Sequence, residues 1–185
     1  MENNWSKTIL QVYRYLPRLT YAYDKLIETR AFNSGSSTCN NMSFNNVMNV
    51  ADNIINLSER KVTLINLKLI TEKALKNIDR NMARLLILKF IDGKKSVEIA
   101  EKFNVCLRTF FRKVKTALDS FTKALNRLGY SEDKLCSMLS KERWINEVYR
   151  TFEKENDNNV CENFEFKNQI KSNIIIEFKK ISAFN

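Results

Sequence analysis

The sequence predicts an all-α fold, and three observations lead to this prediction. Gly occurs three times and Pro once in 185 residues, so few positions suit the tight turns of a sheet protein. Hydrophobic residues make up 44% of the chain, which is enough for a core. Apolar residues recur at steps of three and four, the spacing that places them on one face of a helix. We expect three regions, at 1–79, 80–128 and 129–185.

Several classes of protein are disfavoured by what the sequence lacks. The chain has no histidine, no carboxylate pair and no glycine loop in a catalytic arrangement, so we do not expect an enzyme. No two of its four cysteines have metal-ligand spacing, so we expect reduced thiols, no metal and no cofactor. No basic n-region or apolar h-region opens the chain, and the apolar runs are too short to span a bilayer. We therefore expect a cytoplasmic protein without a membrane segment. The cysteines are Cys39, Cys106, Cys136 and Cys161.

The basic charge is concentrated in one quarter of the chain. The formal net charge is +10. Residues 80–127 carry twelve Lys or Arg and four Asp or Glu, a net charge of +8, which leaves +2 for the remaining 137 residues. Charge focused in this way is expected of a surface that binds a polyanion.

The N-terminal region predicts two long helices. The first covers residues 5–30, with a break near Leu16 because Pro17 cannot continue a helix interior. Residues 32–43, rich in Asn, Ser and Gly, predict a loop. The second helix covers 44–78, and Ser58 could interrupt it. The loop is long enough for the two helices to fold back as an antiparallel hairpin.

The second helix carries apolar residues seven positions apart. Ile55, Val62 and Leu69 form this row, with Ala51, Ile65 and Leu75 or Ile78 nearby. We expect the row to be buried against the rest of one domain. The alternative is a coiled-coil-like dimerisation arm, which several Asn residues beside the row disfavour.

The central region predicts three helices joined by short turns. The first covers 81–91 and ends at Asp92-Gly93, where Gly93 supplies a positive φ. The second covers 97–103 with Ser96 as its N-cap. Asn104 then takes the left-handed turn position, Val105 fills the corner, and Cys106 stands where Ser or Thr usually caps. The inward residues are Ala83, Leu86, Ile87 and Phe90 in the first helix, and Val97, Ile99, Ala100 and Phe103 in the second.

The third helix, residues 107–125, has two chemically different faces. Its buried stripe consists of Phe110, Val114, Ala117, Leu118, Phe121 and Leu125. The opposite face carries Arg108, Thr109, Arg112, Lys113, Lys115 and Thr116. A helix that reads DNA in the major groove needs such guanidinium, hydroxyl and ammonium groups.

The candidate DNA-binding residues divide by role. Arg108, Thr109 and Arg112 would read bases, whereas lysines on the helix and before it would neutralise phosphates. Glu98 would accept a hydrogen bond from cytosine or orient Arg112 or Arg108. Phe111 would pack against a flanking helix or contact a thymine methyl. The full set is Lys94, Lys95, Ser96, Leu107, Arg108, Thr109, Phe111, Arg112, Lys113, Lys115 and Thr116.

These residues carry a family resemblance. Residues 96–118, SVEIAEKFNVCLRTFFRKVKTAL, resemble region four of bacterial sigma factors. They are similar above all to the sigma-region-four-like helix-turn-helix regulators of phages and prophages of low-GC Gram-positive bacteria. The matching features are Glu98-Ile99-Ala100, Val105, Arg108-Thr109-Phe110, Ala117-Leu118 and the upstream segment 84–93. The resemblance covers about 45 residues and implies a DNA-binding helix-turn-helix. The promoter-melting module of a complete sigma factor is not visible in residues 1–79, and Asn104 and Cys106 replace the commoner Gly and Ser.

The C-terminal region predicts further helices. Ser131 would cap a helix at 132–139, and Ser140 would cap one at 141–155. Residues 155–159 predict a polar linker, and a helix is expected around 167–180. The apolar residues expected to cover the core are Leu135, Met138, Leu139, Trp144, Ile145, Val148, Tyr149 and Phe152.

We interpret the chain as a sequence-specific transcription regulator that binds double-stranded DNA. Three alternatives remain: an atypical sigma subunit with RNA polymerase as its partner, a phage DNA-packaging protein like a small terminase, and a protein-interaction module without DNA binding. A homodimer could form through the N-terminal hairpin or through the apolar C-terminal tail.

Overall fold

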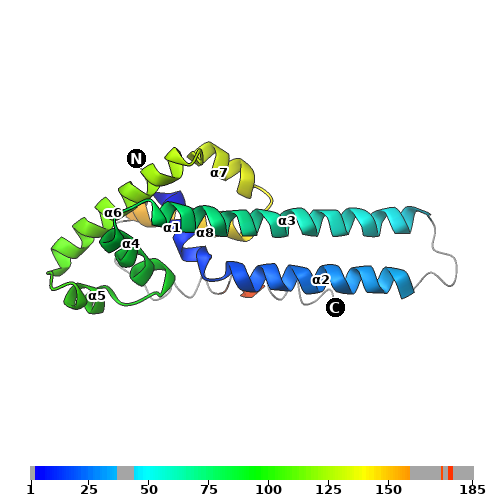
Figure 1. Ribbon diagram of the computed structural model, residues 1–185, viewed down its shortest axis with the longest axis horizontal. Coiled ribbons are helices and arrows are strands. Elements are labelled where there is room, and N and C mark those ends of the chain that lie inside the picture. The colour runs from blue at the N-terminus through cyan, green and yellow to red at the C-terminus, as the bar shows by residue number, and fades with distance from the viewer. Residues whose placement is uncertain (1–2, 37–43, 159–171, 173–174, 177–185) are drawn as a thin grey trace. The chain divides into compact units, whose positions relative to one another are not determined.

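The computed structural model describes residues 3–36, 44–158, 172 and 175–176, and these residues form helices and no strand (Figure 1). The predicted all-α fold is confirmed. The chain divides into two compact units. Of the described residues, the first unit holds 3–14 and 67–158, and the second holds 15–36, 44–66, 172 and 175–176.

The predicted break before Pro17 is confirmed. Helix α1 (Asn4–Tyr13) ends before it, and α2 (Leu16–Ser36) begins one residue before the proline. Pro17 is tolerated there because the first N–H groups of a helix have no partner within the helix. The loop begins later than predicted, since α2 continues through residues 32–36. Each further residue adds a hydrogen bond to an existing helix, which offsets the weak preference of Asn and Ser for loops. Residues 37–43 lie outside the described part of the chain.

In the second unit, α2 runs antiparallel to the first part of α3 (Phe44–Lys76), as the predicted hairpin requires (Figure 1). Lys61 of α3 donates a hydrogen bond to the Asp24 carboxylate of α2. The Arg60 guanidinium lies 5.0 Å from the centre of the Tyr23 ring. An ion pair and a cation–π contact therefore join the two helices.

The sequence interpretation of α3 was wrong in two respects. Ser58 does not interrupt the helix, because its hydroxyl donates to the Ile54 carbonyl 2.8 Å away. The row of Ile55, Val62 and Leu69 is exposed and not buried. The helix has a second apolar row, and that row occupies the core instead. Its members are Leu64, Leu67, Ile70 and Ala74.

In the first unit, α1 packs against η2 (Ile87–Ile91), α6 (Leu107–Arg127) and α8 (Arg143–Asn158). The Trp5 ring stacks on Tyr149 with 4.5 Å between ring centres. Helices α4 (Arg80–Leu86) and α5 (Ser96–Lys102) pack against α6. The long α6 is therefore held by α1, α4 and α5.

The segment predicted as one helix at 81–91 changes its winding after Leu86. Helix α4 is followed by the π-helical turn η2, in which the Asp92 N–H donates to the Ile87 carbonyl. The extra residue in a π turn rotates the side chains of this segment about the helix axis, so Leu88 is buried and Ile87 is only partly buried. Ala83 is also only partly buried, whereas Leu86 and Phe90 are buried as predicted.

Helix α5 begins one residue earlier than predicted. Ser96 is its first residue and Lys95 its N-cap, and the Ser96 hydroxyl accepts a hydrogen bond from Lys89, 2.6 Å away. The inward positions Ile99 and Ala100 are confirmed. Val97 is exposed and Phe103 is half-buried, so the buried face of this two-turn helix is narrower than predicted.

The turn between α5 and α6 is the one that Asn104 predicted. Asn104 has a φ of +51°, its N–H donates to Glu101, and the Val105 N–H donates to Ala100. This pair of bonds is the Schellman motif, which ends a helix at a left-handed residue. Gly129, with a φ of +81°, ends α6 in the same way. Gly93 also has the predicted positive φ.

The C-terminal helices cover the first unit. Ser131 accepts a hydrogen bond from the Lys134 N–H and caps α7 (Glu132–Leu139), as predicted. Ser140 does not cap α8, because it ends α7 and its hydroxyl donates to the Ser137 carbonyl. Helix α8 begins at Arg143 and continues to Asn158, through most of the predicted linker. The predicted helix at 167–180 lies outside the described residues, apart from 172, 175 and 176, which are helical.

Candidate nucleic-acid interface

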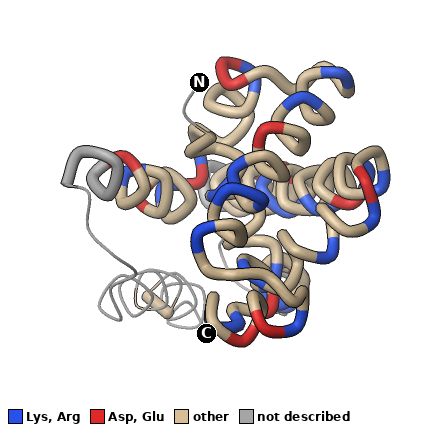
Figure 2. Tube along the Cα trace, turned by 90° about the vertical axis from the view of Figure 1, so that its left-hand side faces the viewer, with Lys and Arg blue, Asp and Glu red and all other residues tan. Residues whose placement is uncertain are grey.

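Helix α6 separates an apolar face from a basic one. The predicted stripe from Phe110 to Leu125 is buried throughout, and Ala124 joins it. At 100° per residue, Arg108, Arg112 and Lys115 lie on the opposite side of the helix, and all three are exposed. Figure 2 turns the left-hand side of Figure 1, where α5 is labelled, towards the viewer, and both Lys or Arg (blue) and Asp or Glu (red) positions are visible in this view. The helix thus presents cations to solvent along its first three turns.

The cations of α6 are not neutralised by neighbouring acids. Within the described part of the chain, no carboxylate lies within 4.0 Å of the side-chain nitrogens of Arg108, Arg112, Lys113 or Lys115. Glu98 is exposed and forms no ion pair with Arg108 or Arg112, so the predicted orienting contact is absent. The guanidinium and ammonium groups keep their donors for an external anion.

Lys94 and Lys95 are exposed in the short segment between η2 and α5. Both are therefore accessible to solvent just before α5. Ser96 differs from them. It is buried, and Lys89 donates to its hydroxyl, so this hydroxyl does not lie on the exposed face.

Two apolar members of the predicted set, Leu107 and Phe111, lie partly in solvent. Phe111 is 49% exposed, and its ring meets Phe110 edge-on at 5.3 Å. The Lys89 ammonium lies 6.0 Å from the Phe111 ring centre. One side of Phe111 is therefore packed against its neighbours, while the other is open to contact from outside.

The threonines of α6 contact their own helix. The Thr116 hydroxyl donates to the Arg112 carbonyl, 3.1 Å away. The Thr109 hydroxyl lies 3.2 Å from the Cys106 sulfur at the start of the helix. This hydrogen bond and the backbone N–H groups of the first turn lower the pKa of the Cys106 thiol.

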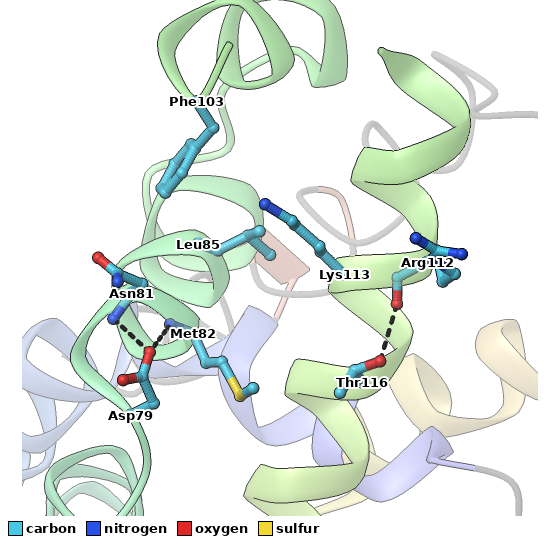
Figure 3. Close-up of a pocket in the computed structure, with 8 residues that line it drawn as sticks. All are labelled: Asp79, Asn81, Met82, Leu85, Phe103, Arg112, Lys113 and Thr116. Carbon is cyan, nitrogen blue, oxygen red and sulfur yellow. Dashed lines mark hydrogen bonds between the residues drawn. The ribbon is translucent and has the colours of Figure 1, made fainter. Parts of the chain in front are cut away.

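A pocket of about 230 Å³ opens beside α6, and the sequence did not predict it (Figure 3). Lys113 extends into this pocket, whereas Arg112 extends away from it. The Asp79 carboxylate on the opposite wall accepts hydrogen bonds from the Asn81 and Met82 N–H groups. Asp79 is the N-cap of α4, and because Asp is a preferred N-cap residue, its sequence position could have indicated the start of this helix. The remaining wall residues are Leu85, Phe103, Thr116 and Arg112.

The support that α1 provides to α6 was not predicted from the sequence. The Asn3 amide donates to the Asp119 carboxylate at 2.6 Å and accepts from the Thr122 hydroxyl at 2.9 Å. The Ser6 hydroxyl lies 2.7 Å from the Thr122 hydroxyl. These contacts join residues more than a hundred positions apart, which no local pattern can reveal.

Comparisons with known proteins do not identify the chain: no protein-family model, curated protein or solved structure matches it. Among the described residues, no cluster of three or more Cys, Asp or Glu has a geometry suited to a metal ion. No helix in this part of the chain is long and apolar enough to cross a membrane.

Proposed function

We propose that this chain binds double-stranded DNA by inserting residues 107–118 of α6 into the major groove. One observation carries the proposal. The helix buries a continuous apolar stripe and carries Arg108, Arg112 and Lys115 on its opposite, exposed face. A helix with its side chains is about 10–12 Å wide, and the major groove is about 12 Å wide, so the two fit.

The exposed side chains support a division of roles. Arg108 and Arg112 present planar guanidinium groups, which bind guanine edges in a bidentate way. Lys115, and Lys94 and Lys95 before α5, are exposed point charges suited to phosphates. Lys113 extends into the pocket beside α6, so it would reach a phosphate only after leaving that pocket.

The test is selection of bound sequences from random DNA, followed by a salt titration on the selected site. We expect Arg112→Ala to weaken binding to that site by about 1–3 kcal/mol and to relax the base choice at one position. Lys115→Ala should weaken all sequences equally and lower the salt slope by about one. Lys134→Ala, at an exposed lysine of α7, is the matched control and should change neither. Equal affinity for selected and scrambled DNA would contradict sequence-specific binding.

Sequence-specific binding, together with the resemblance to sigma-region-four-like proteins, would support a role as a transcription regulator. The same resemblance makes RNA polymerase a candidate partner. Co-purification with core polymerase and promoter-dependent RNA synthesis would identify a sigma subunit. A regulator alone would bind its site without supporting synthesis.

A further inference from the structure

One face of α3 carries a row of apolar side chains that the protein leaves in solvent. Met48, Ile55, Val62 and Leu69 succeed one another at intervals of seven residues. They are 48%, 56%, 53% and 47% exposed, respectively. Single exposed apolar residues are common on protein surfaces, but a row at constant heptad spacing is the pattern that one helix presents to another.

The residues three positions further along complete the pattern. Ala51, Ser58 and Ile65 stand where a heptad repeat places its second core residue. Ile65 is also exposed, and Ala51 and Ser58 are small enough to let a second helix approach closely. The row from Met48 to Leu69 spans about 32 Å, or roughly three heptads. This is the minimum length at which such a repeat indicates a coiled coil.

We propose that this face of α3 binds the α3 of a second copy of the chain, antiparallel to it. A two-fold pair needs a surface that is complementary to itself. In the register where Ile55 faces the partner's Ile65, Leu69 faces the partner's Ala51 and Val62 faces the partner's Ser58. Leu69 and Val62 then each meet a small side chain on either side of the Ile layer. At each end of the row, Met48 meets the partner's Glu72, which already accepts a hydrogen bond from Tyr13 of its own chain.

The charges beside the row favour the same orientation. Asp52 and Glu59 flank its N-terminal half, whereas Lys73 lies beside its C-terminal end. In the antiparallel register, the partner's Lys73 lies on the same flank as Asp52, five residues beyond the position directly opposite, and this pair occurs twice. The same register brings Lys61 near the partner's Lys61, but each is paired with Asp24 of its own chain. A parallel pair would place Lys68 beside the partner's Lys73 and so bring like charges together.

The first test is sedimentation of the full chain at concentrations from about 1 to 100 µM, which covers weak dimers. We expect a species of twice 21.8 kDa at the upper end. Val62→Glu should raise the dissociation constant at least about 100-fold, because it would place two charges in the apolar interface. The helical content should not change, since Val62 is exposed. Asn56→Glu is the matched control, because Asn56 is exposed on α3 outside the row.

The second test concerns orientation. Asp52→Lys alone should weaken the dimer by about three- to tenfold, since it would place two lysines together at each end. Adding Lys73→Asp should restore the affinity in an antiparallel pair. A monomer at every concentration, or a dimer that tolerates Val62→Glu, would overturn the proposed interface. A dimer without rescue by the second change would overturn the antiparallel orientation. The proposal does not depend on DNA binding, so either can fail alone.

Discussion

Helices α6 and α3 both carry apolar residues at helical spacing, but the row of α6 is buried and the heptad row of α3 is exposed. In α6 the apolar residues lie on one side of the helix, so only that side can be the buried face. In α3 they lie on two sides, with Leu64, Leu67, Ile70 and Ala74 in the core and Met48, Ile55, Val62 and Leu69 in solvent. An apolar row shows that a face can be buried, but its neighbours decide whether it is.

The largest expected effect tests the buried side of α6. Phe121→Ala should lower the free energy of unfolding by about 3–5 kcal/mol, because the Phe121 ring is fully buried. Thr116→Ala, at an exposed position of the same helix, should change it by less than about 0.5 kcal/mol. Urea denaturation measures both values. Equal losses for the two variants would remove the distinction between the faces.

The next effect separates the two rows of α3. Leu64→Ala should cost about 2–5 kcal/mol, since Leu64 is fully buried. Val62→Ala, two residues earlier on the exposed face, should cost less than about 0.5 kcal/mol at concentrations where the chain is monomeric. Thermal unfolding at low protein concentration compares them. A reversal of this order would mean that the heptad row is the buried one.

A smaller effect tests the turn that positions α6. Asn104→Val should destabilise the protein by about 1–2 kcal/mol, because a β-branched residue is strained at a φ of +51°. Asn104→Gly should be neutral or slightly stabilising, since Gly adopts this conformation freely. Denaturation midpoints distinguish the two variants, and similar losses in both would argue against a role for backbone strain.

The C-terminal part of α3 contains a pH-dependent contact. Tyr13 donates a hydrogen bond to Glu72, 2.8 Å away, and burial together with this carboxylate raises the pKa of Tyr13 to about 12, from an ordinary value of 10.0. The folded state therefore keeps the phenol proton more strongly than the unfolded state does. Its contribution to stability is complete below pH 10 and is lost as the pH rises towards 12. Tyr13→Phe should flatten the pH dependence of the urea midpoint in this range.

The smallest expected effect concerns the reactivity of the Cys106 thiol at the start of α6 and not the stability of the protein. Because the pKa of the Cys106 thiol is lowered, its thiolate forms at a lower pH than that of an ordinary cysteine. In a variant with the other three cysteines replaced by Ser, the rate of Cys106 alkylation should rise at a lower pH than the rate for a free cysteine does. Thr109→Val should move the alkylation profile to higher pH, and an unchanged profile would show that Thr109 does not contribute.

The sequence by itself determined several local features of this protein. Pro17 fixed the break between α1 and α2, Asn104 and Gly129 fixed the ends of α5 and α6, and Ser131 fixed the start of α7. These features depend on the backbone conformation of one or two residues, which the residue type restricts directly. The spacing of the apolar residues also predicted the two faces of α6, because these residues form a single stripe along the helix.

Only the tertiary structure decided which apolar row of α3 is buried. It also decided that Lys89 donates a hydrogen bond to Ser96, and that Glu98 forms no ion pair with Arg108 or Arg112. It also formed the pocket beside α6 and the contacts of Asn3 with Asp119 and Thr122. Each of these depends on how separate segments of the chain pack against one another. Helical periodicity fixes where a residue points on its own helix, but it carries no information on which other helix lies there.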